Sequence, residues 1–181
     1  MRHPISFAAI AALAVAPFPA GAEVAASSES GFVSHNAVEV SVTPGEAWSA
    51  LFAPAGWWNG EHTYSGAAAN LTIEPAAGGC FCETIPPTDG TASGYIEHMR
   101  VLYIDPRVRT LRMTGALGPL QSEAVTGVLT MAVEPSGSGS KITWDYVVGG
   151  YMRMPVAQTA TLVDRVIGEQ LSRLAARLGQ S

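Results

Sequence analysis

The segment from Pro155 to Leu178 carries the pattern that most constrains the fold. Apolar side chains recur along it at steps of three and four residues, which places them on one face of an α-helix. They are Val156, Ala160, Val163, Ile167, Leu171, Leu174 and Leu178. Pro155 suits the first turn of such a helix, and Gly179 suits its end. We therefore predict one amphipathic helix over residues 155–178, roughly 36 Å long, whose apolar face must be buried against the rest of the chain.

The residues before this helix are predicted to form mainly β-strands, separated by turns rich in glycine and proline. Seven segments fit: residues 37–42, 70–74, 80–85, 94–104, 108–114, 124–134 and 141–148. After the first strand, Thr43, Pro44 and Glu46 have the residue types and spacing of a helical capping box. This order predicts an α+β domain. In it, a curved antiparallel sheet of about seven strands, with two short helices after the first strand, wraps around the long C-terminal helix.

The first 22 residues have the layout of a secretory signal peptide. Arg2 precedes an apolar run over residues 5–16 that is too short to span a bilayer, and Ala20-Gly21-Ala22 offers a small-x-small cleavage site. We predict cleavage after Ala22, a flexible leader of small and polar residues over 23–35, and one domain over 36–181. The expected location is the periplasm or the cell exterior.

The charge balance argues against two classes of partner. The formal net charge is −5 and the sequence has no cluster of lysine and arginine, which disfavours nucleic acids and anionic membrane surfaces. No later apolar run reaches the length of a membrane span, so no membrane contact is expected after signal cleavage.

Cys80 and Cys82 are the two cysteines of the chain. On a regular strand they share one face at a separation of about 6.6 Å, near the upper limit for a disulfide. We predict that they are free, small, packed residues. Because no histidine accompanies them at the spacing of metal ligands, the sequence predicts no metal site and no other cofactor.

Two histidines are candidates for acid-base chemistry. His62 lies in an aromatic-rich segment and could act as a general base or cap a loop through hydrogen bonds. His98 lies on the strand 94–104, both of whose faces mix polar and apolar residues. A β-bulge midway along that strand would switch its register, and the facing of His98 decides whether it is a pocket residue or a surface residue.

Glu83 and Tyr146 are the other two candidates. Glu83 shares a strand face with Phe81, so an inward facing would make it a buried carboxylate that needs a partner. A structural ion pair with Arg100 or Arg112 is favoured over catalysis. Tyr146 alternates with polar residues and is expected to face inward, where its hydroxyl would meet a ligand or a backbone group.

Several short motifs, in this order along the chain, resemble the SRPBCC superfamily, which has the START-like or helix-grip fold. They are Trp57-Trp58 with His62 and Tyr64, Gly78 to Glu83, Val101 to Pro106, Leu111 to Gly115, and the closing helix. The resemblance covers roughly residues 35–178 and is greatest to the polyketide cyclase/dehydrase and chaperone-ATPase-activator-like branch. It implies a hydrophobic cavity between the sheet and the C-terminal helix. The iron-binding residues of the superfamily's oxygenase subunits have no counterpart here.

These observations favour an exported protein that binds a small hydrophobic or aromatic ligand in that cavity. The candidate ligand-binding residues are Trp57, Trp58, Tyr64, Phe81, Met113, Trp144, Tyr146 and Ile167. A first alternative is a polyketide cyclase- or dehydratase-like enzyme that uses the acid-base candidates. A second alternative is a protein-interaction module of the cell envelope, which the polar outer strand faces make the least favoured.

Overall fold

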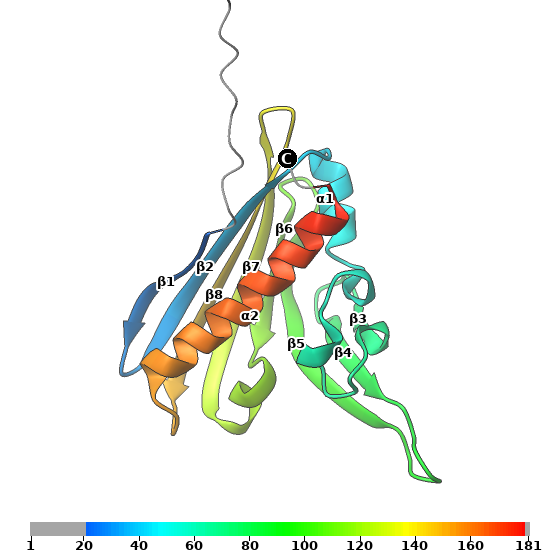
Figure 1. Ribbon diagram of the computed structural model, residues 1–181, viewed down its shortest axis with the longest axis vertical. Helices are drawn as coiled ribbons and strands as arrows, with labels where there is room; N and C mark the ends of the chain where they lie inside the picture. The colour runs from blue at the N-terminus through cyan, green and yellow to red at the C-terminus, as the bar shows by residue number, and fades with distance from the viewer. Residues whose placement is uncertain (1–20, 180–181) are drawn as a thin grey trace, which may run out of the picture.

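The computed structural model describes residues 21–179. Its centre is one antiparallel sheet of eight strands in the order β1-β2-β8-β7-β6-β5-β4-β3 (Figure 1). The strands are β1 (Gly21–Ser28), β2 (Gly31–Val40), β3 (Leu71–Ile73), β4 (Cys80–Ile85), β5 (Gly94–Asp105), β6 (Thr110–Gly115), β7 (Ala124–Ser136) and β8 (Gly139–Tyr151). The predicted curved antiparallel sheet is confirmed, with one strand more than expected.

The additional strand lies where a flexible leader was predicted, so the interpretation of residues 23–35 was wrong. These residues form most of β1 and the first half of β2, which pair with each other across a short turn. Every second side chain of β2 is buried, but two of the buried positions are the polar Ser34 and Asn36. Because of these two residues, no alternation of apolar side chains marks the strand before residue 37.

The predicted signal peptide lies outside the described residues, except for its last two. Gly21 and Ala22 begin β1 and pair with Ala37 and Asn36. A cut after Ala22 would therefore remove the first two residues of an edge strand and leave the rest of the sheet intact.

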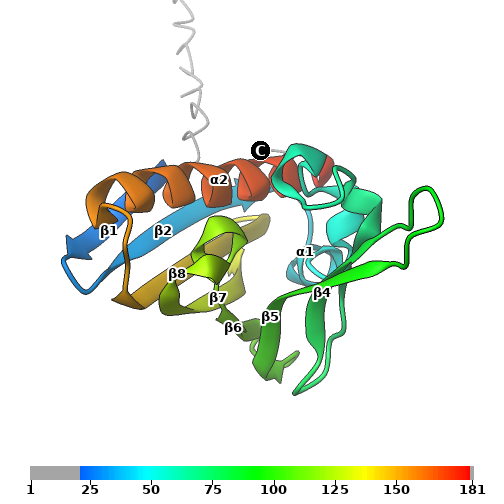
Figure 2. The ribbon, with the colours of Figure 1, turned by 90° about the horizontal axis from the view of Figure 1, so that it is seen from below.

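The long C-terminal helix α2 (Val156–Arg177) runs across the inner side of the sheet and packs on β1 and β2. Seen from below, the sheet bends away from the helix toward β5 and β6 (Figure 2). The predicted apolar face is the buried one, with Ala160, Ile167, Leu171 and Leu174 at its centre. None of the helices between residues 21 and 179 combines the length and apolar character that crossing a membrane requires.

A buried polar cluster fastens α2 to β2. Oδ1 of Asp164 accepts hydrogen bonds from Ser34 Oγ at 2.6 Å and from Asn36 Nδ2 at 3.1 Å. This contact compensates the two buried polar positions of β2 and fixes the helix along its strand. The residues next to Asp164 in the sequence do not predict this role of its carboxylate.

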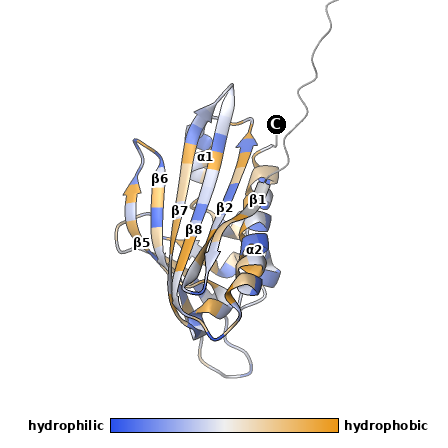
Figure 3. Cartoon of the chain, turned by 90° about the vertical axis from the view of Figure 1, so that its left-hand side faces the viewer, coloured by the Kyte–Doolittle hydropathy of each residue, from blue (hydrophilic) through white to orange (hydrophobic). Residues whose placement is uncertain are grey.

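Side chains of alternating polarity give the sheet one apolar face, visible as banded strands in Figure 3. The inward residues of β7 and β8, such as Leu129, Met131 and Ile142, are fully buried. Helix α1 (Pro44–Ala50) covers one end of this face and begins with the predicted capping box of Thr43 and Glu46. The second predicted short helix is replaced by three 3₁₀ turns: η1 (Pro54–Gly56), η2 (Gly60–His62) and η3 (Ala68–Asn70).

The strand β5 is bulged where it pairs with β4. Phe81 pairs with Met99 and Cys82 pairs with Glu97, so His98 is an extra residue on β5. As a result His98 and Met99 are both buried although they are adjacent. The predicted switch of register is thereby confirmed.

The prediction of free cysteines was wrong, because Cys80 and Cys82 form a disulfide. Their Cα atoms lie 5.3 Å apart, closer than on a regular strand and within the usual disulfide range. The same two residues flank the point where β4 slips against β5. The disulfide therefore lies beside the bulge of β5.

Candidate functional site

A cavity of about 550 Å³ lies beside the first half of α2. The helix and the loop before it contribute Met154, Thr159, Leu162, Val163, Val166 and Ile167. The turn η4 (Gly118–Ser122) and the residue before it contribute Leu117, Gly118, Pro119 and Leu120. The opposite wall consists of Trp58, Glu61, His62, Thr63, Tyr64 and His98. Most of this lining is apolar, and the half-exposed Tyr64 and Leu162 place its mouth at the surface.

Hydrogen bonds from α2 hold the wall that η2 forms. The side chain of Asn59, the N-cap of η2, donates to Glu169 Oε1 at 2.6 Å, and its backbone N–H donates to Gln170 Oε1 at 2.7 Å. Glu169 Oε2 lies 3.1 Å from His62 Nε2. Trp58 Nε1 in turn donates to the carbonyl of His62 at 3.0 Å. The helix therefore fixes both the histidine and the tryptophan of this wall.

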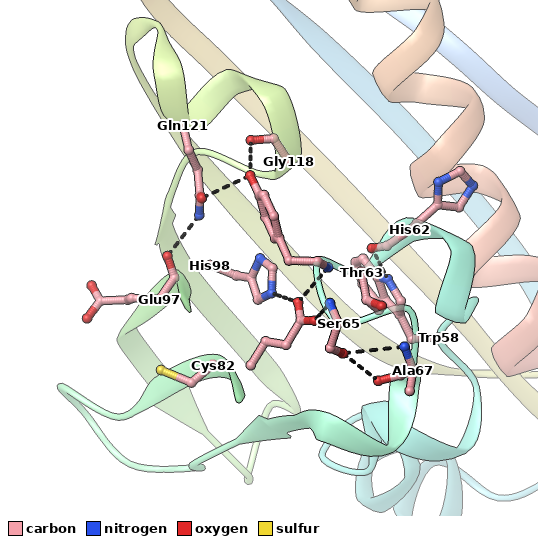
Figure 4. A network of polar contacts seen from close by, with 12 residues as sticks. Trp58, His62, Thr63, Ser65, Ala67, Cys82, Glu97, His98, Gly118 and Gln121 are labelled. Atoms are coloured by element: carbon pink, nitrogen blue, oxygen red, sulfur yellow. Dashed lines mark hydrogen bonds and ion pairs between the residues drawn. The ribbon is translucent and has the colours of Figure 1, made fainter. Parts of the chain in front are cut away.

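Tyr64 links this wall to η4, whose Gly118 and Gln121 are labelled in Figure 4. Its hydroxyl lies 3.0 Å from the carbonyl oxygen of Gly118 and 3.2 Å from Gln121 Oε1. Gln121 Nε2 donates to the carbonyl of Glu97 on β5 at 2.9 Å. The two sides of the cavity are thus joined by side-chain hydrogen bonds.

His98 lines the cavity and forms a buried pair with Glu83, which does not line it. Glu83 is only 1% exposed and His98 6%. Glu83 Oε2 lies 3.0 Å from His98 Nε2 and accepts the backbone N–H of Tyr64 at 3.1 Å. Its other carboxylate oxygen accepts the backbone N–H of Ser65. The expected partner was an arginine, and this was wrong: Arg100 pairs with Glu97, and Arg112 donates to Thr130.

These contacts set the charge of both groups. Desolvation raises the pKa of Glu83, but hydrogen bonds from Ser65, Tyr64 and His98 outweigh it and lower the pKa below its ordinary value. Burial lowers the pKa of His98, and this effect exceeds the opposing one of the Glu83 carboxylate. At pH 7 the pair is therefore an ionised carboxylate and a neutral imidazole.

The imidazole of His98 is also held by its aromatic neighbours. The ring centroid of Phe81 lies 5.0 Å away and that of Tyr64 lies 6.0 Å away. Within residues 21–179, Nδ1 of His98 has no hydrogen-bond partner, yet it is not an enclosed atom. In Figure 4, a dashed line leaves one ring nitrogen of His98 and none leaves the other. His98 is one of the residues that line the cavity.

The structure divides the predicted site residues into two groups. The cavity is lined by Trp58, Tyr64, Ile167, His62 and His98. The others do not line it: Glu83 is buried next to His98, and the hydrophobic core holds Trp57, Phe81, Met113, Trp144 and Tyr146. An aromatic series joins the two groups, in which Trp58 contacts Phe81 at 5.3 Å and Trp57 contacts Trp144 at 5.5 Å between ring centroids.

Tyr146 is an acid-base candidate that the geometry removes from the site. Its hydroxyl donates to the carbonyl of Gly115 at 3.2 Å and accepts the N–H of Leu117 at 3.1 Å. Burial raises the pKa of Tyr146 to about 12. The hydroxyl therefore fixes the backbone that presents Leu117 to the cavity, and it is not free for a ligand.

The sequence reasoning missed the contribution of η4 to the site. Residues 115–119 have the composition of a turn, and the turn is indeed followed by a 3₁₀ segment that closes the cavity. Leu117 and Leu120, the apolar residues in this glycine- and proline-containing stretch, are both buried. Two leucines within a predicted turn were the sequence signal that could have identified this segment as part of the site. Residues 21–179 hold no group of three His, Cys, Asp or Glu side chains that could bind a metal ion.

No protein-family model and no curated protein matches the sequence. Solved structures do match in fold. Ara h 8.0201 is 15% identical, with 81% of this chain and 96% of that chain covered and a TM-score of 0.55. A Rhodobacter sphaeroides protein is 17% identical, with 87% and 97% covered and a TM-score of 0.54. A Mesorhizobium loti protein is 18% identical, with 80% and 94% covered and a TM-score of 0.55.

The chain has the helix-grip fold. The matches span 94–97% of each solved chain. At these identities the likeness concerns the fold alone. What the helix-grip cavity does in this protein must be argued from its own residues.

Proposed function

We propose that the protein binds a small hydrophobic or aromatic molecule in the cavity beside α2. The observation that carries the proposal is a mostly apolar space of about 550 Å³, within the range of about 300–1,000 Å³ common for small-molecule sites. The core around Trp144 and Leu129 is fully buried, and neither residue lines the cavity. The resemblance of the sequence to the SRPBCC superfamily supports the same function.

The shape of the site suits an occupant that enters from the surface. Leu162 is 55% exposed at the mouth, whereas Ile167 at the other end of the lining is 2% exposed. When an apolar ligand covers hydrophobic side chains that face water in a concave surface, the free energy of the system falls. Since η2 and η4 are tied to α2 and β5 by side-chain hydrogen bonds, the walls are formed before a ligand binds.

A thermal-shift panel tests this proposal. It contains oleic acid, cholesterol, 2-naphthol and 2-methoxynaphthalene, and we expect at least one aromatic compound to raise the unfolding midpoint. Val163→Trp, which fills the cavity, should remove that increase. Thr161→Trp is the matched control, because Thr161 lies on the exposed side of the same helix and does not line the cavity. No shift with any compound, or an equal shift in Val163→Trp, would refute the proposal.

The Glu83–His98 pair favours a second candidate function, proton abstraction from a bound carbonyl compound. Glu83 holds the imidazole, and the free Nδ1 could take a proton from the carbon beside the carbonyl. The C–H electron pair then forms the carbon–carbon double bond of an enolate, and the π pair of the carbonyl moves to its oxygen. The probe is 2-tetralone in D₂O, followed by NMR. Faster hydrogen–deuterium exchange with the wild type than with His98→Phe supports this candidate, and equal rates reject it.

We also propose that the protein is exported. Arg2, the apolar run over residues 5–16 and Ala20-Gly21-Ala22 support a cleavable signal. The Cys80–Cys82 disulfide supports an oxidising compartment. Mass spectrometry of the protein from a periplasmic fraction should give a mature chain that begins at Glu23. A full-length chain that stays in the cytoplasm would reject export.

A further inference from the structure

We propose that the cavity selects uncharged ligands that carry a hydrogen-bond donor of the phenol or enol type, and that His98 Nδ1 accepts this donor. The inference rests on the proposed binding function and specifies its ligand class. It follows from the tautomer of His98 and from the hydrogen bonds of the other polar residues that line the cavity.

The tautomer follows from the buried pair. An ionised carboxylate can only accept hydrogen bonds, so Glu83 requires the proton of the neutral imidazole to be on Nε2, 3.0 Å away. Nδ1 then carries a lone pair and no hydrogen. It is an acceptor on a side chain that is 6% exposed and lines the cavity.

The side-chain donors of the cavity lining are already used within the protein. Trp58 Nε1 donates to a carbonyl of the chain, and the hydroxyls of Thr63 and Thr159 donate to the carbonyls of Gly60 and Pro155 at 2.7 and 3.0 Å. The Tyr64 hydroxyl has acceptors in η4. His62 Nε2 lies against the carboxylate of Glu169. The lining side chains therefore offer acceptors and no free donor, which is the complement of a hydroxyl-bearing ligand.

The charges around the cavity disfavour an anionic ligand. Glu83 lies directly behind His98, and Glu61 lines the cavity on the side of η2. The titratable groups that face the imidazole are Glu83 from β4 and Tyr64, with Glu61 and His62 on the same wall of the cavity. A ligand carboxylate placed against Nδ1 would be repelled by the lone pair of that nitrogen and by the negative charge of Glu83 behind it. A neutral hydroxyl meets neither penalty.

Three probes of one ring system test the inference by isothermal titration calorimetry at pH 7: 2-naphthol, 2-methoxynaphthalene and 2-naphthoate. We expect the naphthol to bind roughly five- to tenfold more tightly than its methyl ether, the value of one hydrogen bond to a buried acceptor. The naphthoate should bind most weakly. Equal affinity of the naphthol and the ether would overturn the inference and leave the proposed function standing. If no probe binds, both fail.

Two variants assign the effect to His98 Nδ1. His98→Phe keeps an aromatic ring but has no acceptor, so the preference for naphthol over its ether should fall to about onefold while the ether still binds. Glu83→Gln keeps the imidazole and reverses its tautomer, because the glutamine amide donates to Nε2 and the proton moves to Nδ1. That variant should also lose the preference. A preference that survives both substitutions would overturn the assignment.

Discussion

Glu83→Gln is the substitution whose effect on stability follows most directly from the structure. The carboxylate is 1% exposed and accepts hydrogen bonds from two backbone N–H groups, of Tyr64 and Ser65, and from His98. Glutamine has nearly the same shape, so no cavity is created. Its amide oxygen can still accept, but its amide nitrogen cannot, and the charge is lost.

The expected cost can be worked out from these bonds. A hydrogen bond to a charged acceptor contributes about 1 kcal/mol more than one between neutral groups. One of the two backbone bonds is lost because the amide nitrogen cannot accept it, the other is weakened, and the one to His98 is rearranged. Together these changes should lower the free energy of unfolding by about 2–3 kcal/mol. For a domain of this size that corresponds to a fall in Tm of roughly 5–10 °C.

Urea denaturation followed by circular dichroism measures this change, with Glu97→Gln as the matched control. Glu97 directly precedes His98 on β5. It pairs with Arg100, and its side chain is 48% exposed. A surface pair of this kind contributes about 0–1 kcal/mol. Because the pKa of Glu83 is lowered, the difference between wild type and Glu83→Gln should persist at neutral pH. It should shrink as the pH falls through the folded-state pKa. A loss no larger than that of the control would refute the reasoning.

Three further changes have expected results. Folding lowers the pKa of His98, so as the pH falls the unfolded chain protonates this imidazole before the folded protein does. The free energy of unfolding of the wild type should therefore decline below about pH 6.5. His98→Phe should lack this part of the decline, measured by urea titrations at a series of pH values. Asp164→Ala removes the acceptor of Ser34 and should cost about 2–3 kcal/mol, measured by the same titration; a cost below about 0.5 kcal/mol would contradict the role of the cluster. Replacing both Cys80 and Cys82 by serine should cost only about 1–2 kcal/mol because the loop they close is short, and complete unfolding by calorimetry would contradict this.

The fold could be predicted because its main elements carry periodic patterns. The stripe that includes Ala160, Ile167 and Leu174 is the face that α2 buries, and its spacing alone specifies a helix. The first half of β2 could not be predicted in this way. Its buried Ser34 and Asn36 are stable inside only because Asp164, far along the sequence, bonds them, and a local pattern does not report such a partner.

The candidate site was predicted only in outline. The alternation of residues along β8 correctly placed Trp144 and Tyr146 on the inner face of the sheet. It does not indicate which part of that face is covered by other side chains and which part borders the cavity. Trp57 contacts Trp144 and helps to close the core there, so the open volume lies instead beside η2 and η4. The facing of His98 depended on a bulge, which mixed strand faces suggest but do not locate.

A crystal structure of the protein with bound 2-naphthol tests the central claim most directly. The naphthalene ring should lie between α2 and Trp58, and its hydroxyl oxygen should be about 2.8 Å from His98 Nδ1. A naphthol bound outside the cavity, or one inside it with the hydroxyl directed to solvent, would contradict the claim.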